Sequence, residues 1–243
     1  MATALILGAT SDIGVAIAKK FASEKYDIIL AARKPELLKP LESDIRIRYG
    51  VVCNSQKFDA LQYESHLEFF SNIQPKPEVS ICVFGVLDDE IQAFDDWNLT
   101  ERMINTNYTG AVSILNVIAK QYISLNKGTI IGISSVAGDR GRASKLIYAS
   151  SKAAFSTYLS GLRNKCFKDN VHVMTVQPGF VYTKMTENQP LPKLITSTPA
   201  EVADIIHNAY LKKKNLIYVK WFWRYIMLII QWIPEFMFKK MKL

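Results

Sequence analysis

The stretch Tyr148-Ala149-Ser150-Ser151-Lys152 opens a segment whose pattern predicts a helix through Lys165. Residues at i and i+4 lie on one helix face with Cβ atoms roughly 5–6 Å apart, so the Lys152 ammonium can lie near the Tyr148 phenol. A cation about 4 Å away contributes on the order of 4 kcal/mol at an effective dielectric near 20. That interaction would lower the phenol pKa from about 10 toward neutrality, so we expect Tyr148 to act as an acid or base. The alternative is an ordinary amphipathic surface pair.

Strands and helices alternate on both sides of this stretch, which predicts one α/β domain. The expected fold is a doubly wound parallel sheet, a Rossmann fold, with helices on both faces. Strands are predicted at residues 4–7, 27–32, 51–58, 79–84, 129–133, 171–176 and 216–219. Helices are predicted after Gly14 to residue 23, then at 35–49, 62–73, 98–125, 148–165 and 198–211. Residues 184–197, with Pro190 and Pro192, are expected to form a mobile flap over a site.

The first strand runs into the turn Gly8-Ala9-Thr10-Ser11-Asp12-Ile13-Gly14, which resembles a phosphate cradle. Gly8 permits a tight turn, Gly14 allows helix and strand to approach, and the helix N-terminus offers free N–H groups. We expect a dinucleotide pyrophosphate here, bound by Gly8, Thr10, Ser11, Asp12, Ile13 and Gly14. The alternative is an ordinary strand-to-helix turn.

Three further strand ends contribute candidate cofactor ligands. The second strand ends at Arg33 and has no acid there. An arginine accommodates a 2′-phosphate, whereas an acid binds the ribose 2′-hydroxyl of NAD, so NADP(H) is favoured over NAD(H). Asp59 is a candidate partner for the adenine amino group, with a helix cap as the alternative. Gly85 lets the chain pass close to the cofactor.

Composition places the protein among globular cytoplasmic proteins. The chain has 243 residues, of which 49% are hydrophobic and 21% charged. Cys53, Cys82 and Cys166 lack metal-ligand spacing and are expected to be reduced thiols. The N-terminus has neither the apolar length nor the basic lead of a signal peptide. His66, His172 and His207 are isolated, so we expect no metal site.

The net charge of +8 is concentrated at the C-terminus. Residues 212–243 carry eight Lys or Arg and one acid, 8 − 1 = +7, against 22 − 21 = +1 in residues 1–211. Many aromatic and aliphatic residues lie between these charges, which favours an anionic membrane surface over nucleic acid. We therefore divide the chain into a nucleotide-binding domain, 1–219, and an amphipathic tail, 220–243. We expect the tail to form one helix with a narrow polar face, which consists of Lys220, Arg224, Gln231 and Glu235. The alternative is that the tail packs on a second subunit.

Taken together, the glycine turn, Asn107, Ser135, Tyr148, Lys152 and the Pro178-Gly179 turn with Thr183 resemble the short-chain dehydrogenase/reductase family. The resemblance covers the whole chain and implies a homo-oligomeric enzyme that interconverts a ketone and a secondary alcohol with NAD(P). It implies Tyr148 as the acid, with Ser135 donating to the same oxygen, Lys152 on the nicotinamide ribose and Asn107 holding a relay water. The cofactor would also contact Pro178, Gly179, Val181 and Thr183. Asp12 and Val83-Phe84-Gly85 depart from the family pattern, which commonly has Gly and Asn-Ala-Gly.

A narrower resemblance concerns the substrate. Five segments resemble the reductases of decaprenylphosphoryl keto-ribose. They are the glycine turn, Phe58-Asp59-Ala60-Leu61, Phe84-Gly85-Val86-Leu87, Ser134 to Gly138 and the tail around residues 224–234. These enzymes reduce a lipid-linked 2-keto sugar beside a flavin oxidase partner. The basic loop between Ser135 and Tyr148 would suit its phosphate, through Arg140 or Arg142. For the loop, the alternatives are a solvated loop or a subunit contact. For the protein, they are a different carbonyl substrate or a non-catalytic dinucleotide sensor or scaffold.

Overall fold

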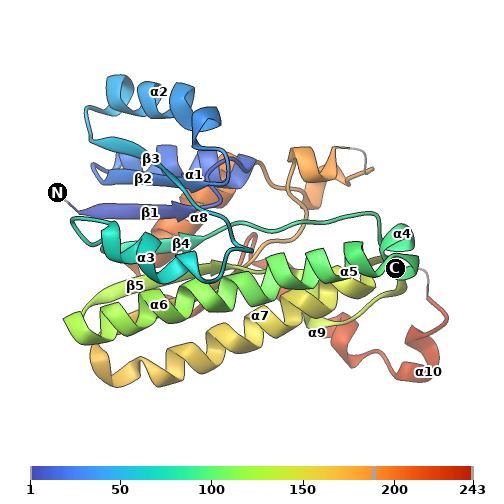
Figure 1. Cartoon of the computed structure of the whole chain (residues 1–243). Helices are drawn as coiled ribbons and strands as arrows, with labels where there is room; N and C mark the ends of the chain where they lie inside the picture. The colour runs from blue at the N-terminus through green and yellow to red at the C-terminus, as the bar shows by residue number, and fades with distance from the viewer. Residues whose placement is uncertain (1, 188–189, 242–243) are drawn as a thin grey trace.

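The computed structural model describes residues 2–187 and 190–241, in which seven parallel strands form one sheet of order β3-β2-β1-β4-β5-β6-β7 (Figure 1). The strands are β1 (Thr3–Leu7), β2 (Asp27–Ala32), β3 (Cys53–Lys57), β4 (Val79–Cys82), β5 (Gly128–Ile133), β6 (Val171–Gln177) and β7 (Leu216–Tyr218). The fold class and all seven strands agree with the prediction, with small shifts at the ends. The largest shift is in the third strand, which is shorter than residues 51–58.

The sheet is buried on both faces because its central strands are continuous apolar runs. Every residue of β1 is buried, and the strand pairs in parallel with β2 on one side and β4 on the other. One apolar layer lies beneath helices α1 (Asp12–Ser23), α2 (Lys39–Tyr49) and α8 (Pro199–Leu211). The other lies beneath α3 (Ser65–Asn72), α6 (Gly110–Leu125) and α7 (Leu146–Lys165) (Figure 1).

The strand order reverses between β1 and β4, and this position determines where a ligand can bind. From β1 the chain proceeds outward to β2 and β3, then returns to β4 on the other side. In open α/β sheets, ligands bind in the crevice beyond the carboxyl ends of the strands at such a switch point. Gly8, Arg33, Asp59 and Gly85 all follow carboxyl ends of these four strands, so the topology brings the predicted cofactor residues together.

The predicted helix at residues 98–125 is interrupted in the structure. α5 (Trp97–Ile104) passes into a π-helical turn at Asn105–Thr109 before α6 begins at Gly110. Gly110 has no room for a side chain, since a Cβ there would lie 2.3 Å from the carbonyl oxygen of Ala60. π turns of this kind are frequent at functional sites, and this one contains Asn107. The sequence pattern also missed α4 (Glu90–Asp95), a short helix just before α5.

The tail packs against the body, and its predicted polar face is wrong. The chain forms α9 (Phe222–Trp232) and, after Pro234, α10 (Glu235–Phe238), so proline ends the single helix that we expected. Lys220 donates to the carbonyl of Thr196 and Gln231 to that of Asp139, so both point toward the body. The outward side of α9 is instead an apolar stripe, which we call the outer stripe. It consists of Trp221, Tyr225, Leu228, Ile229 and Trp232, each at least half exposed.

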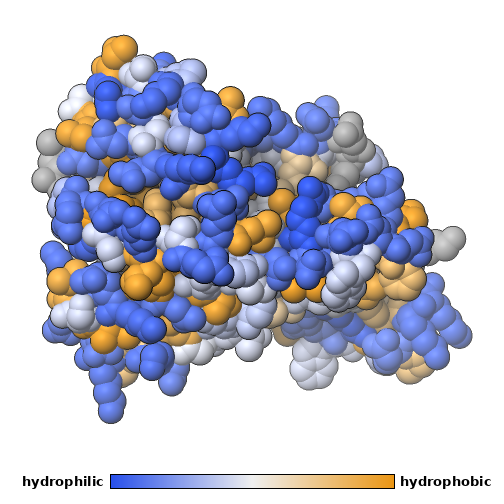
Figure 2. All heavy atoms as spheres, in the orientation of Figure 1, coloured by the Kyte–Doolittle hydropathy of each residue, from blue (hydrophilic) through white to orange (hydrophobic). Residues whose placement is uncertain are grey.

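The face of the molecule seen in Figure 2 is mostly hydrophilic, with hydrophobic residues in small separate patches. Scattered exposed apolar residues of this kind are normal for a folded chain. In the described part of the chain, no helix is both long enough and apolar enough to cross a bilayer.

Candidate active site

The structure brings Tyr148 and Ser135 together. Ser135 follows β5 and caps the short helix Val136–Asp139, accepting a hydrogen bond from the amide of Ala137. Its hydroxyl also forms a hydrogen bond with the side chain of Tyr148, in the first turn of α7. The amide of Val136 donates to the carbonyl of Pro178, which fixes the Ser135 loop to the turn after β6. One carbonyl oxygen could therefore contact both hydroxyl groups.

Lys152 lies one helical turn after Tyr148, as predicted, but its ammonium is directed at the backbone. Nζ lies 5.8 Å from the centroid of the Tyr148 ring and donates to the carbonyl of Ile133 at 3.1 Å. The residue is only 4% exposed, and burial lowers the pKa of Lys152 to about 8. An amine with this pKa still carries its proton at pH 7.

The predicted lowering of the Tyr148 pKa is wrong for this structure. Burial raises the pKa of Tyr148, and the hydrogen bond from Ser135 offsets only part of that effect. Desolvation penalises the phenolate, while the Lys152 charge is engaged with the Ile133 carbonyl. The phenol therefore stays protonated at neutral pH, which suits a proton donor.

Asn107 connects the π turn to the segment after β4 and to α7. Its Oδ1 accepts from the amide of Val86 at 2.8 Å, and Nδ2 donates to the Val86 carbonyl and to Ser151. A Cβ on Gly85 would lie 3.0 Å from Asn107 Oδ1 and 3.3 Å from Lys152 Nζ. These groups therefore surround Gly85 closely. The relay water predicted for Asn107 remains a prediction.

Glu90 is a site residue that the sequence reasoning missed. Its carboxylate accepts from the amides of Ile147 and Tyr148 at 3.0 and 2.9 Å, so α4 caps the helix that carries the tyrosine. The N-cap residue of α7, Lys145, provides no side-chain hydrogen bond of its own. A free helix N-terminus favours a carboxylate. Only the partner's distance in sequence, 57 residues, concealed this contact.

The glycine turn has the geometry of a phosphate cradle. Gly8 has φ +97°, and a Cβ there would lie 2.6 Å from the amide nitrogen of Phe84. At Gly14 a Cβ would lie 2.6 Å from the carbonyl oxygen of Gly8. Ser11 holds the turn by donating to the Gly8 carbonyl and accepting from the Gly14 amide. Both positions therefore require glycine, and the backbone of the turn is open to a ligand.

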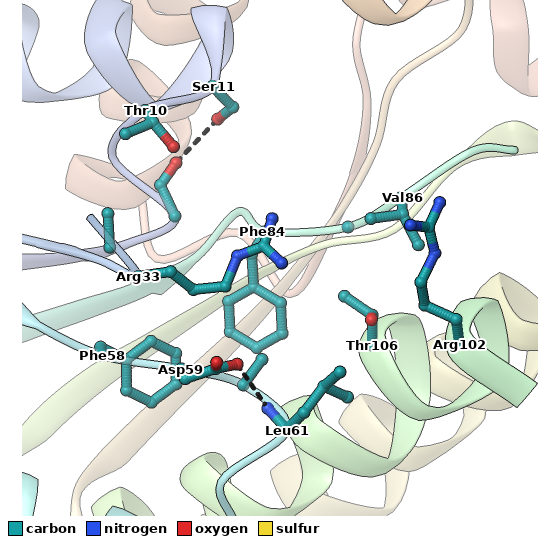
Figure 3. Close-up of a pocket in the computed structure, with 14 residues that line it drawn as sticks. Thr10, Ser11, Arg33, Phe58, Asp59, Leu61, Phe84, Val86, Arg102 and Thr106 are labelled. Atoms are coloured by element: carbon teal, nitrogen blue, oxygen red, sulfur yellow. Dashed lines mark hydrogen bonds between the residues drawn. The ribbon is translucent and has the colours of Figure 1, made fainter. Parts of the chain in front are cut away.

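A cavity of about 210 Å³ begins at this turn and follows the strand ends, as Figure 3 shows. We call it the nucleotide pocket. The Arg33 side chain reaches across it toward Phe84, and the Asp59 carboxylate lies below, accepting from the amide of Leu61 (Figure 3). Asp59 thus caps a turn and not a helix, because the N-cap residue of α3 is Glu64. Arg102, which the sequence analysis did not select, reaches the pocket from α5 and pairs with Asp88.

Asp12 and Thr183 are placed where the flap begins. Asp12 Oδ2 accepts from the amide of Lys184 at 2.7 Å, so this departure from the glycine pattern connects α1 to the flap. Thr183 shares a hydrogen bond with Thr186 and begins a short helical turn. At the base of the flap, Val181 bridges to Ser197. Within the predicted flap, short helical turns occupy Lys184–Thr186 and Lys193–Ile195, and residues 188 and 189 lie outside the described residues. The mobility expected of the flap stays a prediction.

A second cavity, of about 110 Å³, adjoins Ser135 and Tyr148, and we call it the inner pocket. Most of its walls are apolar, and α9 contributes Trp223, Met227 and Ile230 to them. Its remaining lining residues are Leu87, Val136, Ala137, Arg142, Lys145, Gly179, Phe180, Met185 and Thr186. The tail that we expected to be a separate anchor therefore also forms a wall of this pocket.

The two candidate substrate arginines have different surroundings. Arg140 donates to the carbonyls of Ile230, Gln231 and Ile233, pairs with Glu235, and lies 3.7 Å from the Phe238 ring centroid.

These contacts engage the Arg140 guanidinium with the tail, and a role for Arg140 in binding substrate stays a prediction. Arg142, in contrast, lines the inner pocket with a buried Nε that has no hydrogen-bond partner.

The histidines and cysteines do not assemble into a metal site. Among the described residues, no group of three or more His, Cys, Asp or Glu side chains could hold a metal ion. His66 bonds to Ser113 and to the Asp59 carbonyl, and His207 packs against Phe21. All three cysteines are buried free thiols, as predicted.

Comparisons with known proteins agree with this geometry. A family model described as short chain dehydrogenase matches residues 2–193. The chain is 27% identical to an uncharacterized oxidoreductase of Mycobacterium tuberculosis, covering 99% of this chain and 97% of that protein. It is 30% identical to an uncharacterized oxidoreductase of Streptomyces coelicolor, covering 98% and 94%. A short-chain dehydrogenase from Sphingobium yanoikuyae, solved with NADPH, superimposes with a TM-score of 0.83 at 20% identity, covering 97% of both chains.

Proposed function

Because this chain belongs to the short-chain dehydrogenase family, we propose that it is an NADP(H)-dependent oxidoreductase that interconverts a ketone and a secondary alcohol. The observation that carries the proposal is the meeting of Ser135 and Tyr148 at one end of the inner pocket, with Lys152 one turn along α7. A carbonyl oxygen placed there would accept hydrogen bonds from both hydroxyl groups.

The residues present fit a dinucleotide. Glycine is required at Gly8 and Gly14, and the first turn of α1 offers free N–H groups. Arg33 is exposed at the end of β2, where the sequence Ala32-Arg33-Lys34 has no acid. Arg33 favours NADP(H), with NAD(H) as the alternative, and the similar Sphingobium enzyme was solved with NADPH. When bound, the nicotinamide would supply or accept the hydride.

The chain's own residues supply the proton and the orientation. Ser135 would hold the carbonyl oxygen, and Tyr148 would give its phenolic proton to that oxygen as the alkoxide develops. Burial raises the pKa of this phenol, so it is protonated at neutral pH, as a proton donor must be. Lys152 lies beside Gly85, where its ammonium could bind the ribose hydroxyls.

Replacing Tyr148 with Phe tests the assignment. Removing the proton donor should lower kcat by at least about 10²-fold, while NADPH binding, followed by calorimetry, stays within a few-fold of the native value. Near-native turnover by the Phe variant would show that Tyr148 is not the acid.

The alternative from a different class is a dinucleotide-binding sensor or scaffold. It predicts NADPH binding without turnover of any ketone. A screen of ketoses, steroids and acyl ketones, followed by NADPH absorbance, separates the two functions. The presence of Asn107, Ser135, Tyr148 and Lys152, with Ser135 and Tyr148 lining the inner pocket, supports the enzyme.

For the substrate we propose a lipid-linked keto sugar, as the narrower sequence resemblance implies. The inner pocket combines apolar walls, one of them from α9, with Arg142 and Lys145, which suits a molecule that carries both an apolar chain and a phosphate. Turnover of a polyprenyl-phosphoryl keto sugar at a rate well above that of simple ketones would support it. Failure with that substrate alongside turnover of other ketones would leave the general reductase standing.

We also propose that the enzyme is a cytoplasmic homo-oligomer whose tail rests on an anionic membrane surface. The outer stripe carries two tryptophans, and Arg224, Lys239 and Lys240 are exposed near it. An apolar face with adjacent cations binds anionic interfaces. A Trp221→Ser, Trp232→Ser double variant should lose binding to phosphatidylglycerol vesicles and keep its ketone reductase activity. Unchanged vesicle binding would show that the outer stripe does not contact the membrane. Sedimentation velocity measures the oligomeric state.

A further inference from the structure

The inner pocket has a one-sided charge distribution. Arg142 and Lys145 both line it, and its described lining residues include no Asp or Glu. No ion pair within residues 2–187 and 190–241 involves either side chain. Two cations therefore line a cavity whose other described lining residues are uncharged.

This arrangement is costly for the folded chain. Arg142 Nε is buried without a hydrogen-bond partner, and burial lowers the pKa of Arg142. Most buried polar groups in folded proteins are paired, so a buried guanidinium nitrogen without a partner is unfavourable. The neighbouring Arg140 shows the contrast, because carbonyls of the tail satisfy its guanidinium. The partner that Arg142 lacks is therefore expected to arrive with a ligand.

The surrounding charges would orient such a ligand. A wider cleft of about 870 Å³ adjoins the inner pocket, sharing Leu87, Lys145 and Met185 with it. The wider cleft is lined by four acids, Asp88, Asp89, Glu90 and Asp95, together with apolar Ile91, Phe94 and Leu146. An anionic group would be repelled from the acids and attracted to the inner cations. The apolar remainder of the molecule would lie outward.

We propose that Arg142 and Lys145 form an oxyanion-binding subsite, so that the substrate is a ketone with a phosphate or carboxylate close to its carbonyl group. The inference rests on the proposed function, because Ser135 and Tyr148 line the same pocket and place the carbonyl there. A guanidinium binds either oxyanion through a planar fork of N–H donors.

Matched ketones test the subsite by turnover. One pair is dihydroxyacetone phosphate and dihydroxyacetone; the other is levulinate and its methyl ester. A hydrogen bond to a charged group contributes about 1.5–3 kcal/mol, so kcat/KM should be roughly 10- to 100-fold higher for the anion in at least one pair. The pair that shows the preference identifies phosphate or carboxylate. No preference in either pair overturns the proposal.

Substitutions separate the subsite from general damage. Arg142→Gln should raise KM for the anion and so abolish the preference. Lys168→Gln removes the same charge at an exposed position after α7 and should leave the preference intact. Equal losses on both members of a pair would refute a role for Arg142 in binding the anion.

Binding of a non-reducible anion distinguishes failure of the subsite from failure of the proposed reaction. Hexyl phosphate and hexanoate should bind the NADP⁺-loaded protein in calorimetry at least about tenfold more tightly than hexanol. Arg142→Gln should remove the difference. Such binding without turnover of any ketone would retain the subsite and reject the reductase. Equal affinity for the acids and for hexanol would reject the subsite.

Discussion

Replacing the buried Lys152 with Met should make the cofactor-free protein more stable at neutral pH while removing a site residue. The pKa of Lys152 is lowered from 10.5 to about 8 by burial. The folded state therefore disfavours the ammonium, and the difference of about 2.5 pKa units corresponds to about 3 kcal/mol below pH 8. Methionine has nearly the same length and no charge. Its loss of the hydrogen bond to the Ile133 carbonyl costs about 1 kcal/mol, which leaves a net gain of about 2 kcal/mol at pH 7.

The stability difference between the two proteins should depend on pH. Between the folded pKa of about 8 and the unfolded pKa of 10.5, the unfolded chain holds a proton that the native chain has released. The free energy of unfolding of the native protein therefore rises with pH through this window. The methionine side chain of the Lys152→Met variant cannot titrate, so the advantage of the variant should shrink as the pH rises from 8 and vanish by about pH 10.5.

Urea denaturation of both proteins at pH 7 and at pH 10, without added nucleotide, measures the difference. Tyrosines and cysteines that titrate at high pH are common to both chains, so their contributions cancel in the comparison. A variant that is less stable than the native protein at pH 7, or an advantage that does not change with pH, would refute the argument that Lys152 is held at an energetic cost.

Three other substitutions test particular contacts. Glu90→Gln leaves one carboxamide oxygen where two carboxylate oxygens cap α7. We therefore expect kcat to fall about tenfold with little change in KM, and Glu90→Asp to recover less than half of the native kcat. An unchanged kcat would show that the cap does not position Tyr148. Arg33→Asp should shift cofactor preference, measured as the ratio of the kcat/KM values for NADPH and NADH, toward NADH, because an acid repels a 2′-phosphate and binds a 2′-hydroxyl. An unchanged ratio would show that Arg33 does not contact the 2′ position of the cofactor. Gly179→Ala would place a Cβ 2.0 Å from the Trp223 indole, so it should cost about 1–3 kcal/mol, and adding Trp223→Ala should make the two effects non-additive in a double-mutant cycle.

The parts of the site that could be predicted are those encoded in short stretches of sequence. The strand ends, the glycine turn and the Tyr148–Lys152 pair each depend on residues within a few positions of one another, so periodicity and turn chemistry indicate them. The Glu90 cap could not be found in this way, because its partners lie 57 and 58 residues away. The predicted orientation of α9 was wrong for a similar reason, because Gln231 donates to the carbonyl of Asp139, 92 residues earlier. A helical pattern shows that two faces differ, but only long-range partners determine which face turns inward.

The position of α9 changes how the tail has to be understood. Its inward residues Trp223, Met227 and Ile230 form a wall of the inner pocket, and the Trp223 indole lies against Gly179 in the turn after β6. Arg140, in the loop between Ser135 and Tyr148, holds the end of the same helix through its carbonyls. Deleting residues after Val219 would therefore open the pocket and remove any membrane contact at once, so loss of activity in a truncated chain would not distinguish the two roles. Substitutions in the outer stripe leave the wall in place. If the stripe binds a membrane, the wall of the pocket and the lipid surface are two faces of one helix, and an apolar substrate would reach Tyr148 beside the surface that supplies it.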